Sequence, residues 1–307
     1  MSARILILGA GATGGYFGAR LIEAGADVTF LVRPHRAALL AERGLRVLRS
    51  DGDFARPVRA VTAADGAYDL VVVSCKAYDL DAAIEAIDPA VGAHTRVLPL
   101  LNGLRHLDVL DAAFGAARVL GGLCHVSATL EADGAIRRFG ALERLTYGSR
   151  DGTPVPAAVD AALRAIGPQA VASADVVGAM WDKFAFIATL AGATCLMRGA
   201  VGEIVAADGG AALIRRLYGE CTAVAARSGH PLGAAAADAA LGILAAPGSP
   251  LKSSMLRDLE RGARTECEHV LGDLHARAQA HAVDAPLLAA ALAHLRVYER
   301  RRGHAGG

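Results

Sequence analysis

The most constraining feature of this sequence is a glycine motif close to its N-terminus. The segment Gly9-Ala10-Gly11-Ala12-Thr13-Gly14 has the spacing G-x-G-x-x-G. It follows an apolar run at residues 4–8, opens a helical pattern that extends to about Gly25, and leads into a second apolar run. A strand, a glycine loop and a helix in this order form the phosphate-binding turn of a dinucleotide fold. The alternative is a glycine-rich turn that binds no ligand.

Each glycine of the motif has its own physical task. Gly9 permits the tight turn, Gly11 lets the backbone approach a pyrophosphate, and Gly14 lets the helix pack closely on the strand. The backbone N–H groups at the helix N-terminus then face the negative charge of the ligand. We therefore expect the whole motif to bind cofactor, namely Gly9, Ala10, Gly11, Ala12, Thr13 and Gly14.

Four apolar runs alternate with amphipathic stretches in the first hundred residues. They cover residues 4–8, 27–32, 69–74 and 96–100. Continuous apolar strands separated by helices are typical of a parallel sheet covered on both faces, so the sequence predicts an α/β fold with a Rossmann-type doubly wound sheet.

Further strands are expected outside that alternation. Residues 45–48 and 58–61 flank the turn-rich Ser50-Asp51-Gly52-Asp53 and predict an inserted hairpin. Short strands at 119–129, 135–139 and 143–147 would extend the edge of the sheet.

The second half of the chain has a different texture. From about residue 175 it is rich in alanine and leucine at helical spacing, with breaks near Pro231 and at Pro247-Gly248-Ser249-Pro250. A chain of 307 residues is also long enough for two cores. We predict a Rossmann domain that binds the dinucleotide at residues 1–173 and an all-helical C-terminal domain at 174–307. The apolar stretch 184–197 is shorter than the roughly 20 residues a bilayer requires, so we expect a buried helix there.

Charge and cysteine usage exclude several classes of function. The 32 basic and 31 acidic residues nearly cancel, which leaves no field to hold a nucleic acid or an acidic membrane. The five cysteines are an odd number without a C-x-x-C pair, which argues against disulfides and a metal site. No secretory signal precedes the first strand. We expect a cytoplasmic protein whose partner is a small molecule.

The end of the second strand bears on the choice of cofactor. An NAD site places a carboxylate there for the ribose hydroxyls, whereas this chain has Arg33-Pro34-His35-Arg36. Arg33, with Arg36 or His35 behind it, would pair with a 2′-phosphate through bidentate donors. NADP is therefore favoured over NAD. The alternative is that these arginines are ordinary surface charges.

Lysine is rare in this chain. Only Lys76, Lys183 and Lys252 occur among the 32 basic residues. Arginine cannot release its proton near neutral pH, whereas a partly buried lysine can act as an acid. Lys183 lies at the start of an apolar helix, where a charge has little structural reason to be. The alternative is a lysine that extends from a helix end toward water.

Several ordered motifs together resemble the ketopantoate reductase family across nearly the whole chain. They are the glycine motif, Cys75-Lys76-Ala77-Tyr78, Leu101-Asn102-Gly103, Trp181-Asp182-Lys183, Ser253-Ser254-Met255-Leu256-Arg257-Asp258 and Thr265-Glu266. The resemblance implies a Rossmann domain, a helical domain, an active site in the cleft between them, and NADPH-dependent reduction of ketopantoate to pantoate in pantothenate synthesis.

The resemblance also implies residue roles. Lys183 would be the general acid, and Glu266 would hold that lysine and the nicotinamide ribose. Asn102 would reach both cofactor and substrate, Ser254 would bind the substrate carboxylate, and Lys76 would line the cofactor groove. Because Ser254 and Glu266 would be about 18 Å apart on one continuous helix, we expect Ser254 to lie on a loop that folds back, with a helix N-cap as its alternative role.

The sequence departs from the family pattern in one place. Members of the family carry asparagines four and eight residues after the catalytic lysine, where this chain has Ile187 and Ala191. Apart from Thr194, that helix face is apolar, so a different 2-keto acid with a more apolar side chain is an alternative substrate. A non-catalytic NADP-binding sensor is a second alternative, and a homodimer is open.

Overall fold

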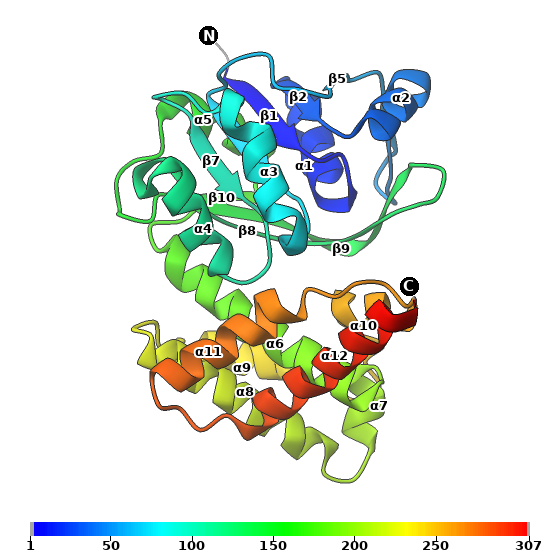
Figure 1. The fold of residues 1–307 in the computed structure, drawn as a ribbon, viewed down its shortest axis with the longest axis vertical. Coiled ribbons are helices and arrows are strands. Elements are labelled where there is room, and N and C mark those ends of the chain that lie inside the picture. The colour runs from blue at the N-terminus through cyan, green and yellow to red at the C-terminus, as the bar shows by residue number, and fades with distance from the viewer. Residues whose placement is uncertain (1–2, 306–307) are drawn as a thin grey trace. The chain divides into compact units, whose positions relative to one another are not determined.

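The structure is a computed structural model that describes residues 3–305. The chain divides into two compact units (Figure 1). The first comprises the residues up to Leu101 together with His106–Val177, and the second comprises Asn102–Arg105 together with the residues from Gly178 onward. The short segment after Leu101 therefore belongs with the helical half of the chain.

The first unit contains the parallel sheet that the sequence predicts. Its strand order is β5-β2-β1-β6-β7, and every neighbouring pair is parallel. The order of β2, β1 and β6 places the chain reversal of a doubly wound fold at β1, where such sheets bind ligands. The strands are β1 (Arg4–Leu8), β2 (Asp27–Leu31), β5 (Arg59–Val61), β6 (Leu70–Val73) and β7 (Arg96–Pro99).

The other strands of this unit form a second sheet, so the expectation that they extend the first sheet was wrong. Its order is β10-β9-β3-β4, with β8 paired to β9. One isolated bridge, between Val97 and Val119, connects the two sheets. The strands are β3 (Leu45–Leu48), β4 (Phe54–Arg56), β8 (Gly121–Leu130), β9 (Ile136–Gly148) and β10 (Ala170–Ala172).

The predicted hairpin also pairs differently. Strand β3 pairs with β4, which begins at Phe54, and not with residues 58–61. Pro57 follows β4 and has no N–H to continue that ladder. The next strand, β5, instead joins the first sheet parallel to β2.

Helix α1 (Ala12–Glu23) lies between the two sheets. It contacts β1 and β2 on one side and β3, β8 and β9 on the other. A Cβ added to Gly15 would lie 2.3 Å from Ile136 Cδ1, and one added to Gly18 would lie 2.4 Å from Phe30 Cζ. The glycines of α1 thus let the helix fit between two sheets.

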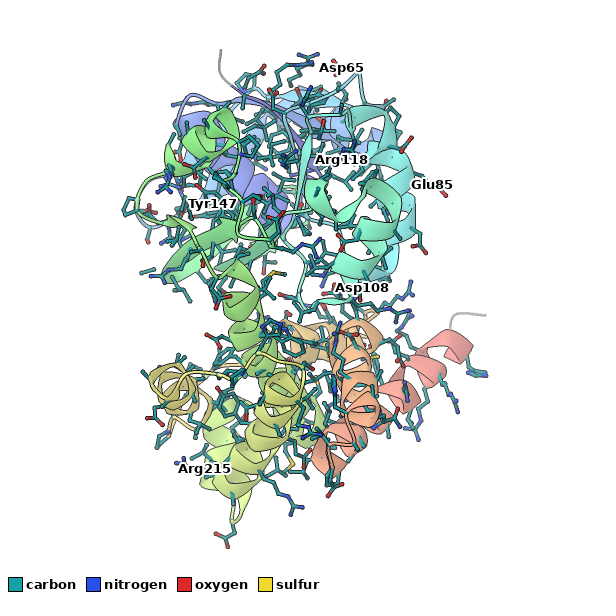
Figure 2. The ribbon with its side chains drawn as sticks, turned by 90° about the vertical axis from the view of Figure 1, so that its left-hand side faces the viewer. Asp65, Glu85, Asp108, Arg118, Tyr147 and Arg215 are labelled. Carbon is teal, nitrogen blue, oxygen red and sulfur yellow. The ribbon has the colours of Figure 1, made fainter. Side chains whose placement is uncertain are left out.

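Other helices and turns complete the first unit. Tyr147 at the end of β9 (labelled in Figure 2) is fully buried, and its hydroxyl donates to Asp160 Oδ1 at 2.7 Å. Burial raises the pKa of Tyr147, with the Asp160 carboxylate acting in the same direction. The helices are α2 (Pro34–Arg43), η1 (Ala77–Asp79), α3 (Leu80–Ile87), η2 (Asp88–Ala90), α4 (Arg105–Phe114), η3 (Ala116–Arg118) and α5 (Ala157–Arg164).

The second unit is helical. Two of the breaks between its helices fall near Pro231 and across residues 247–250, as the sequence predicts, and further breaks fall at 198–200, 207–209, 261–267 and 281–285. Its central helix α6 is 22 residues long, longer than the expected stretch 184–197. It is therefore long and apolar enough to cross a membrane, yet 61% of its apolar window is buried, as in a core helix. The helices are α6 (Val176–Met197), α7 (Val201–Ala206), α8 (Gly210–Arg227), α9 (Ala234–Leu244), α10 (Ser254–Glu260), the π-helical η4 (Glu268–Gly272), α11 (Asp273–Ala280) and α12 (Pro286–Ala305).

Lys183 does not lie at a helix start, which corrects the expectation from the sequence. Helix α6 begins at Val176 because Val176, Met180 and Trp181 are buried and extend its apolar face toward the N-terminus. Lys183 is consequently a half-buried residue in the interior of α6, about two turns from its first residue.

Candidate active site

The glycine loop has the geometry that a dinucleotide pyrophosphate requires. Gly9 has a φ of +93°, a conformation that favours glycine, and its N–H donates to the carbonyl of Leu31 at 2.9 Å. A Cβ on Gly14 would lie 2.1 Å from Ser74 Oγ, so this position tolerates no side chain. A Cβ on Gly11 would meet no protein atom within 4 Å. Gly14 is thus packed against the protein, whereas Gly11 borders open space in which a ligand can lie.

The open side of the loop is the N-terminus of α1. Gly11 is the N-cap of that helix and offers no side chain to its first N–H groups. Ala12 and Thr13 form the first turn, so their small side chains leave the N–H groups accessible to an anion. The chemistry of this helix end is compatible with a phosphate group.

Arg36 holds the glycine loop from the side of α2. Its Nε and Nη2 both donate to the carbonyl of Ala10, at 3.1 and 2.8 Å, and its Nη1 donates to the carbonyl of Gly134 at 2.9 Å. Burial lowers the pKa of Arg36, with the charge of Arg46 adding to the effect. Because three donors of Arg36 are engaged in the fold, Arg36 supports the loop, and Arg33 is the freer cation for a phosphate.

Arg33 is the N-cap residue of α2 and extends into solvent. Its side chain is 82% exposed, and its Nη2 lies 3.0 Å from Asp79 Oδ2. Asp79 ends the short η1 turn that follows Lys76. Lys76 is half-buried, and its carbonyl accepts the N–H of Asp79 at 2.9 Å. Arg33 and the Lys76 segment therefore meet through Asp79.

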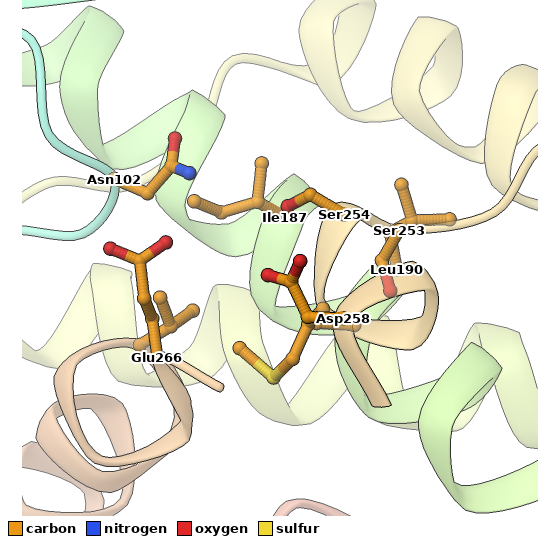
Figure 3. A pocket seen from close by; sticks show the side chains of 10 residues that line it. Asn102, Ile187, Leu190, Ser253, Ser254, Asp258 and Glu266 are labelled. Carbon is orange, nitrogen blue, oxygen red and sulfur yellow. The ribbon is translucent and has the colours of Figure 1, made fainter. Parts of the chain in front are cut away.

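A pocket within the helical unit brings together three of the predicted site residues, Asn102, Ser254 and Glu266, and Lys183 is not among its lining residues. Figure 3 shows Glu266 with its carboxylate directed toward Asn102 on one side, and Asp258 and Ser254 on the other. The cavity itself is small, with a volume of about 60 Å³. The lining residues are Asn102, Ile187, Leu190, Ala191, Ser253, Ser254, Met255, Asp258, Glu266 and Val270.

Ser254 reaches the pocket from the first turn of α10, so the loop expected for it was wrong. The N-cap of that helix is the preceding Ser253, whose Oγ accepts the N–H of Leu256 at 2.9 Å. Ser253 is buried and lies 2.8 Å from the hydroxyl of Thr194 on α6. Helix α10 ends at Glu260, and the turn after it returns the chain to Glu266.

Glu266 is positioned by its neighbour in the sequence. Both the N–H and the hydroxyl of Thr265 donate to Glu299 Oε1 on α12, at 2.7 Å each. Burial acts to raise the pKa of Glu299, but its hydrogen bonds from Thr265 and Arg302 outweigh burial and hold that pKa below its usual range. A π-helical turn begins two residues after Glu266, and such turns often occur at functional sites.

Asn102 is held by contacts of its own backbone. The ring of His269 in η4 hydrogen-bonds to the Asn102 backbone, and a Cβ on Gly103 would lie 3.0 Å from the His269 carbonyl. Gly103 has a φ of +80°, so the chain turns sharply here toward η4. Burial lowers the pKa of His269, although the charges of Glu266 and Asp273 oppose the change.

Lys183 lies one turn before the pocket on the same helix. Ile187 and Ala191, four and eight residues further along α6, both line the pocket. Residues four apart share one face of a helix, so Lys183 continues the pocket-lining face. Thr194, the polar residue expected there, is fully buried and donates to the Leu190 carbonyl at 2.6 Å instead.

Sequence reasoning missed several residues of the site. Asp258 is four residues after Ser254 on α10, so helical spacing alone could have placed it in the pocket. Ser74 and Asp79 follow β6, at the ligand-binding edge of a parallel sheet, and position could have indicated them. For His269 and Glu299 no sequence signal existed, because their partners come from distant segments.

Comparison with known proteins assigns both units. The family described as "Ketopantoate reductase PanE/ApbA" matches residues 5–152, and the one described as "Ketopantoate reductase PanE/ApbA C terminal" matches residues 175–299. An "Uncharacterized oxidoreductase YkpB" of Bacillus subtilis is 35% identical over 97% of this chain and 100% of its own length. A "2-dehydropantoate 2-reductase" of Archaeoglobus fulgidus is 32% identical over 92% of each chain.

Solved structures agree in fold. The 2-dehydropantoate 2-reductase of Geobacter metallireducens superimposes with a TM-score of 0.86 at 30% identity, over 95% of this chain and 99% of that one. A D-mandelate dehydrogenase solved with NADH and anilino(oxo)acetate shares the fold with a TM-score of 0.88 at 21% identity, over 98% of this chain and 99% of that one.

The fold and these matches define the class of enzyme. The chain is an oxidoreductase that acts on CH–OH groups with a nicotinamide dinucleotide, which is NADP in the matched family. Within that class, the matches over both units show that the chain belongs to the ketopantoate reductase family. NADPH-dependent reduction of a small 2-keto acid is the chemistry of that family.

Proposed function

We propose that this chain reduces ketopantoate to pantoate in the cytoplasm, as a step of pantothenate synthesis, with Lys183 as general acid. The observation that carries the proposal is the convergence of Asn102, Ser254 and Glu266 on one pocket, with Lys183 one turn away on the helix that lines it. The names of the curated relatives support the same substrate.

The roles of the residues follow from the charge that develops in the reaction. Reduced nicotinamide, when bound, supplies a hydride to the keto carbon. The carbonyl oxygen then becomes negative and needs a positioned proton donor, which the Lys183 ammonium provides. Glu266 holds that ammonium and a ribose hydroxyl, Asn102 binds cofactor and substrate, and Ser254 donates to the substrate carboxylate. Lys76 and Arg33 bind the dinucleotide.

A second candidate is supported by the walls of the pocket. Ile187, Leu190, Ala191 and Val270 present apolar side chains, and α6 offers no amide where the family has two asparagines. A substrate hydroxyl that faces this wall of α6 finds no hydrogen-bond partner there, so it has no advantage over a methyl group at that position. The alternative substrate is therefore a 2-keto acid with a fully apolar, branched side chain.

Two keto acids that differ by one hydroxyl separate these candidates. Ketopantoate and 3,3-dimethyl-2-oxobutanoate have the same branched carbon, and only ketopantoate carries the terminal hydroxyl. Oxidation of NADPH is followed by its absorbance with each acid. A higher kcat/KM for ketopantoate supports the pantothenate step, and a higher value for the deoxy acid supports the alternative. Binding of NADPH without turnover of any 2-keto acid would leave the non-catalytic sensor.

A further inference from the structure

The ion pair of Arg33 and Asp79 bears on the selectivity of the cofactor site, and the inference rests on the proposed role of Arg33. Arg33 follows β2 and Asp79 follows β6, the two strands that flank β1. The glycine loop follows β1 at the same edge of the sheet. Arg36, in the first helical turn after Arg33, donates a hydrogen bond to the carbonyl of Ala10 in that loop. The pair therefore lies close to the loop that fits the pyrophosphate.

The carboxylate of Asp79 does not make the hydrogen bond that an aspartate at the start of a helix commonly makes. Asp79 is the N-cap residue of α3, a position where the carboxylate commonly accepts a backbone N–H of the first turn. In α3 the Asp79 side chain accepts no such hydrogen bond. The carboxylate instead lies 3.0 Å from Arg33 Nη2.

The pair contains both groups by which dinucleotide sites distinguish their cofactors. A guanidinium accommodates the 2′-phosphate of NADP, whereas a carboxylate accepts hydrogen bonds from the ribose hydroxyls of NAD. A 2′-phosphate carries close to two negative charges near neutral pH. It therefore competes with Asp79 for the Arg33 guanidinium, and the Asp79 carboxylate repels it. A ribose 2′-hydroxyl meets neither penalty and can donate to Asp79.

We propose that Asp79 is a selectivity-determining residue that weakens the preference for NADP, so that the Arg33–Asp79 pair lets the site accept NAD as well. Asp79 lowers the discrimination between NADP and NAD in two ways. It forms an ion pair with Arg33, and it offers a hydrogen-bond acceptor to the unphosphorylated ribose of NAD. Both effects act on binding of the adenosine half of the cofactor and do not involve the substrate pocket.

The test measures equilibrium binding to the full-length chain by calorimetry, without turnover. The probes are adenosine 2′,5′-bisphosphate and 5′-AMP, followed by NADP⁺ and NAD⁺. Asp79→Asn is expected to strengthen binding of the 2′-phosphorylated probes about tenfold at low salt, with little change or a loss for 5′-AMP and NAD⁺. The gain should shrink as ionic strength rises, because the pair is exposed.

Glu85→Gln provides the matched control. Glu85 is exposed on α3 and points outward (Figure 2), so the variant removes one negative charge from the same helix without touching the pair. It should leave the ratio of the two affinities unchanged. An equal gain in both variants would show a general charge effect and would overturn the role of Asp79.

The Arg33→Ala variant separates this inference from the one on which it rests. If Arg33→Ala leaves the ratio of NADP⁺ to NAD⁺ affinity unchanged, Arg33 does not bind the 2′-phosphate, and the cofactor assignment of that residue fails. If Arg33→Ala lowers the ratio of NADP⁺ to NAD⁺ affinity while Asp79→Asn leaves that ratio unchanged or lowers it, Arg33 keeps its role in binding the 2′-phosphate. Asp79 would then be neutral or would orient Arg33 for the phosphate, and the inference fails.

Discussion

The two sites of this chain are built in different ways. The cofactor loop comes from one contiguous segment, residues 9–14, and its function depends on backbone N–H groups and on the absence of side chains. The pocket of the helical unit draws its lining from four separate segments, around Asn102, Ile187, Ser254 and Glu266. Its function depends on the identity of each side chain.

This difference determines how each site can change. A backbone site tolerates little variation, because a single Cβ at Gly14 would collide with the loop itself. A side-chain pocket can exchange one lining residue for another while the helices keep their places. The glycine motif is complete in this chain, and apolar Ile187 and Ala191 stand four and eight residues after Lys183.

The largest effect in this comparison is expected at Lys183. Lys183→Ala should lower kcat by about a hundredfold to ten-thousandfold, the range for loss of a general acid, and leave binding of NADP⁺ unchanged. Turnover by NADPH absorbance and binding by calorimetry are measured on the same preparation. Lys252→Ala is the control, since Lys252 pairs with Glu260 at 2.8 Å outside the pocket. Parallel losses of turnover and binding would make Lys183 a structural residue.

The next effect distinguishes two glycines of one loop. Gly14→Ala should destabilise the first unit by about 1–3 kcal/mol, because the added Cβ would lie 2.1 Å from Ser74 Oγ and 2.3 Å from the Gly9 carbonyl. Gly11→Ala should leave the unfolding midpoint unchanged, since its Cβ enters open space at a φ of −86°. It should nevertheless weaken NADP⁺ binding, because the methyl group occupies the approach to the helix N-terminus. Unchanged binding in Gly11→Ala would contradict a pyrophosphate at this loop.

A smaller effect is expected when an amide is restored to the pocket. Ala191→Asn should raise kcat/KM for ketopantoate relative to 3,3-dimethyl-2-oxobutanoate by about tenfold, as expected for one new hydrogen bond to a hydroxyl. Met197→Asn at the exposed end of the same helix is the control. An unchanged ratio would remove Ala191 from contact with the substrate side chain.

The same contrast explains how much could be predicted from the sequence. The parallel sheet and the glycine loop were predictable, because apolar runs and glycine spacing act locally along the chain. The pairing of β3 with β4, and the second sheet, were not, because strand partners depend on how β3 and β9 pack against α1. The roles of Asn102, Ser254 and Glu266 came from family resemblance, and no local sequence pattern brings these residues to one pocket.

The smallest expected effect concerns the support of Asn102 by His269. Burial lowers the pKa of His269 in the folded chain, so the folded state binds fewer protons than the unfolded state when the pH falls below about 6.5. Stability therefore rises with pH through the interval between the folded and unfolded pKa values, and acidification from pH 7.5 to 5.5 should cost stability. The charges that face His269 are Glu266, Asp273 and Arg105, of which the two carboxylates limit the effect.

His269→Gln removes this titration and keeps a side chain that can donate to the Asn102 backbone. The free energy of unfolding of the full-length chain is measured with denaturant at pH 7.5 and 5.5. On acidification it should fall less for His269→Gln than for the parent. The difference should be less than about 1.4 kcal/mol for each unit by which the pKa of His269 is lowered. His304→Gln, exposed near the end of α12, serves as control. If His269→Gln and the parent lose the same stability on acidification, His269 is not held neutral by its surroundings. The contact with Asn102 would then tolerate a protonated ring, and the substrate pocket would depend less on side-chain burial than the comparison with the glycine loop implies.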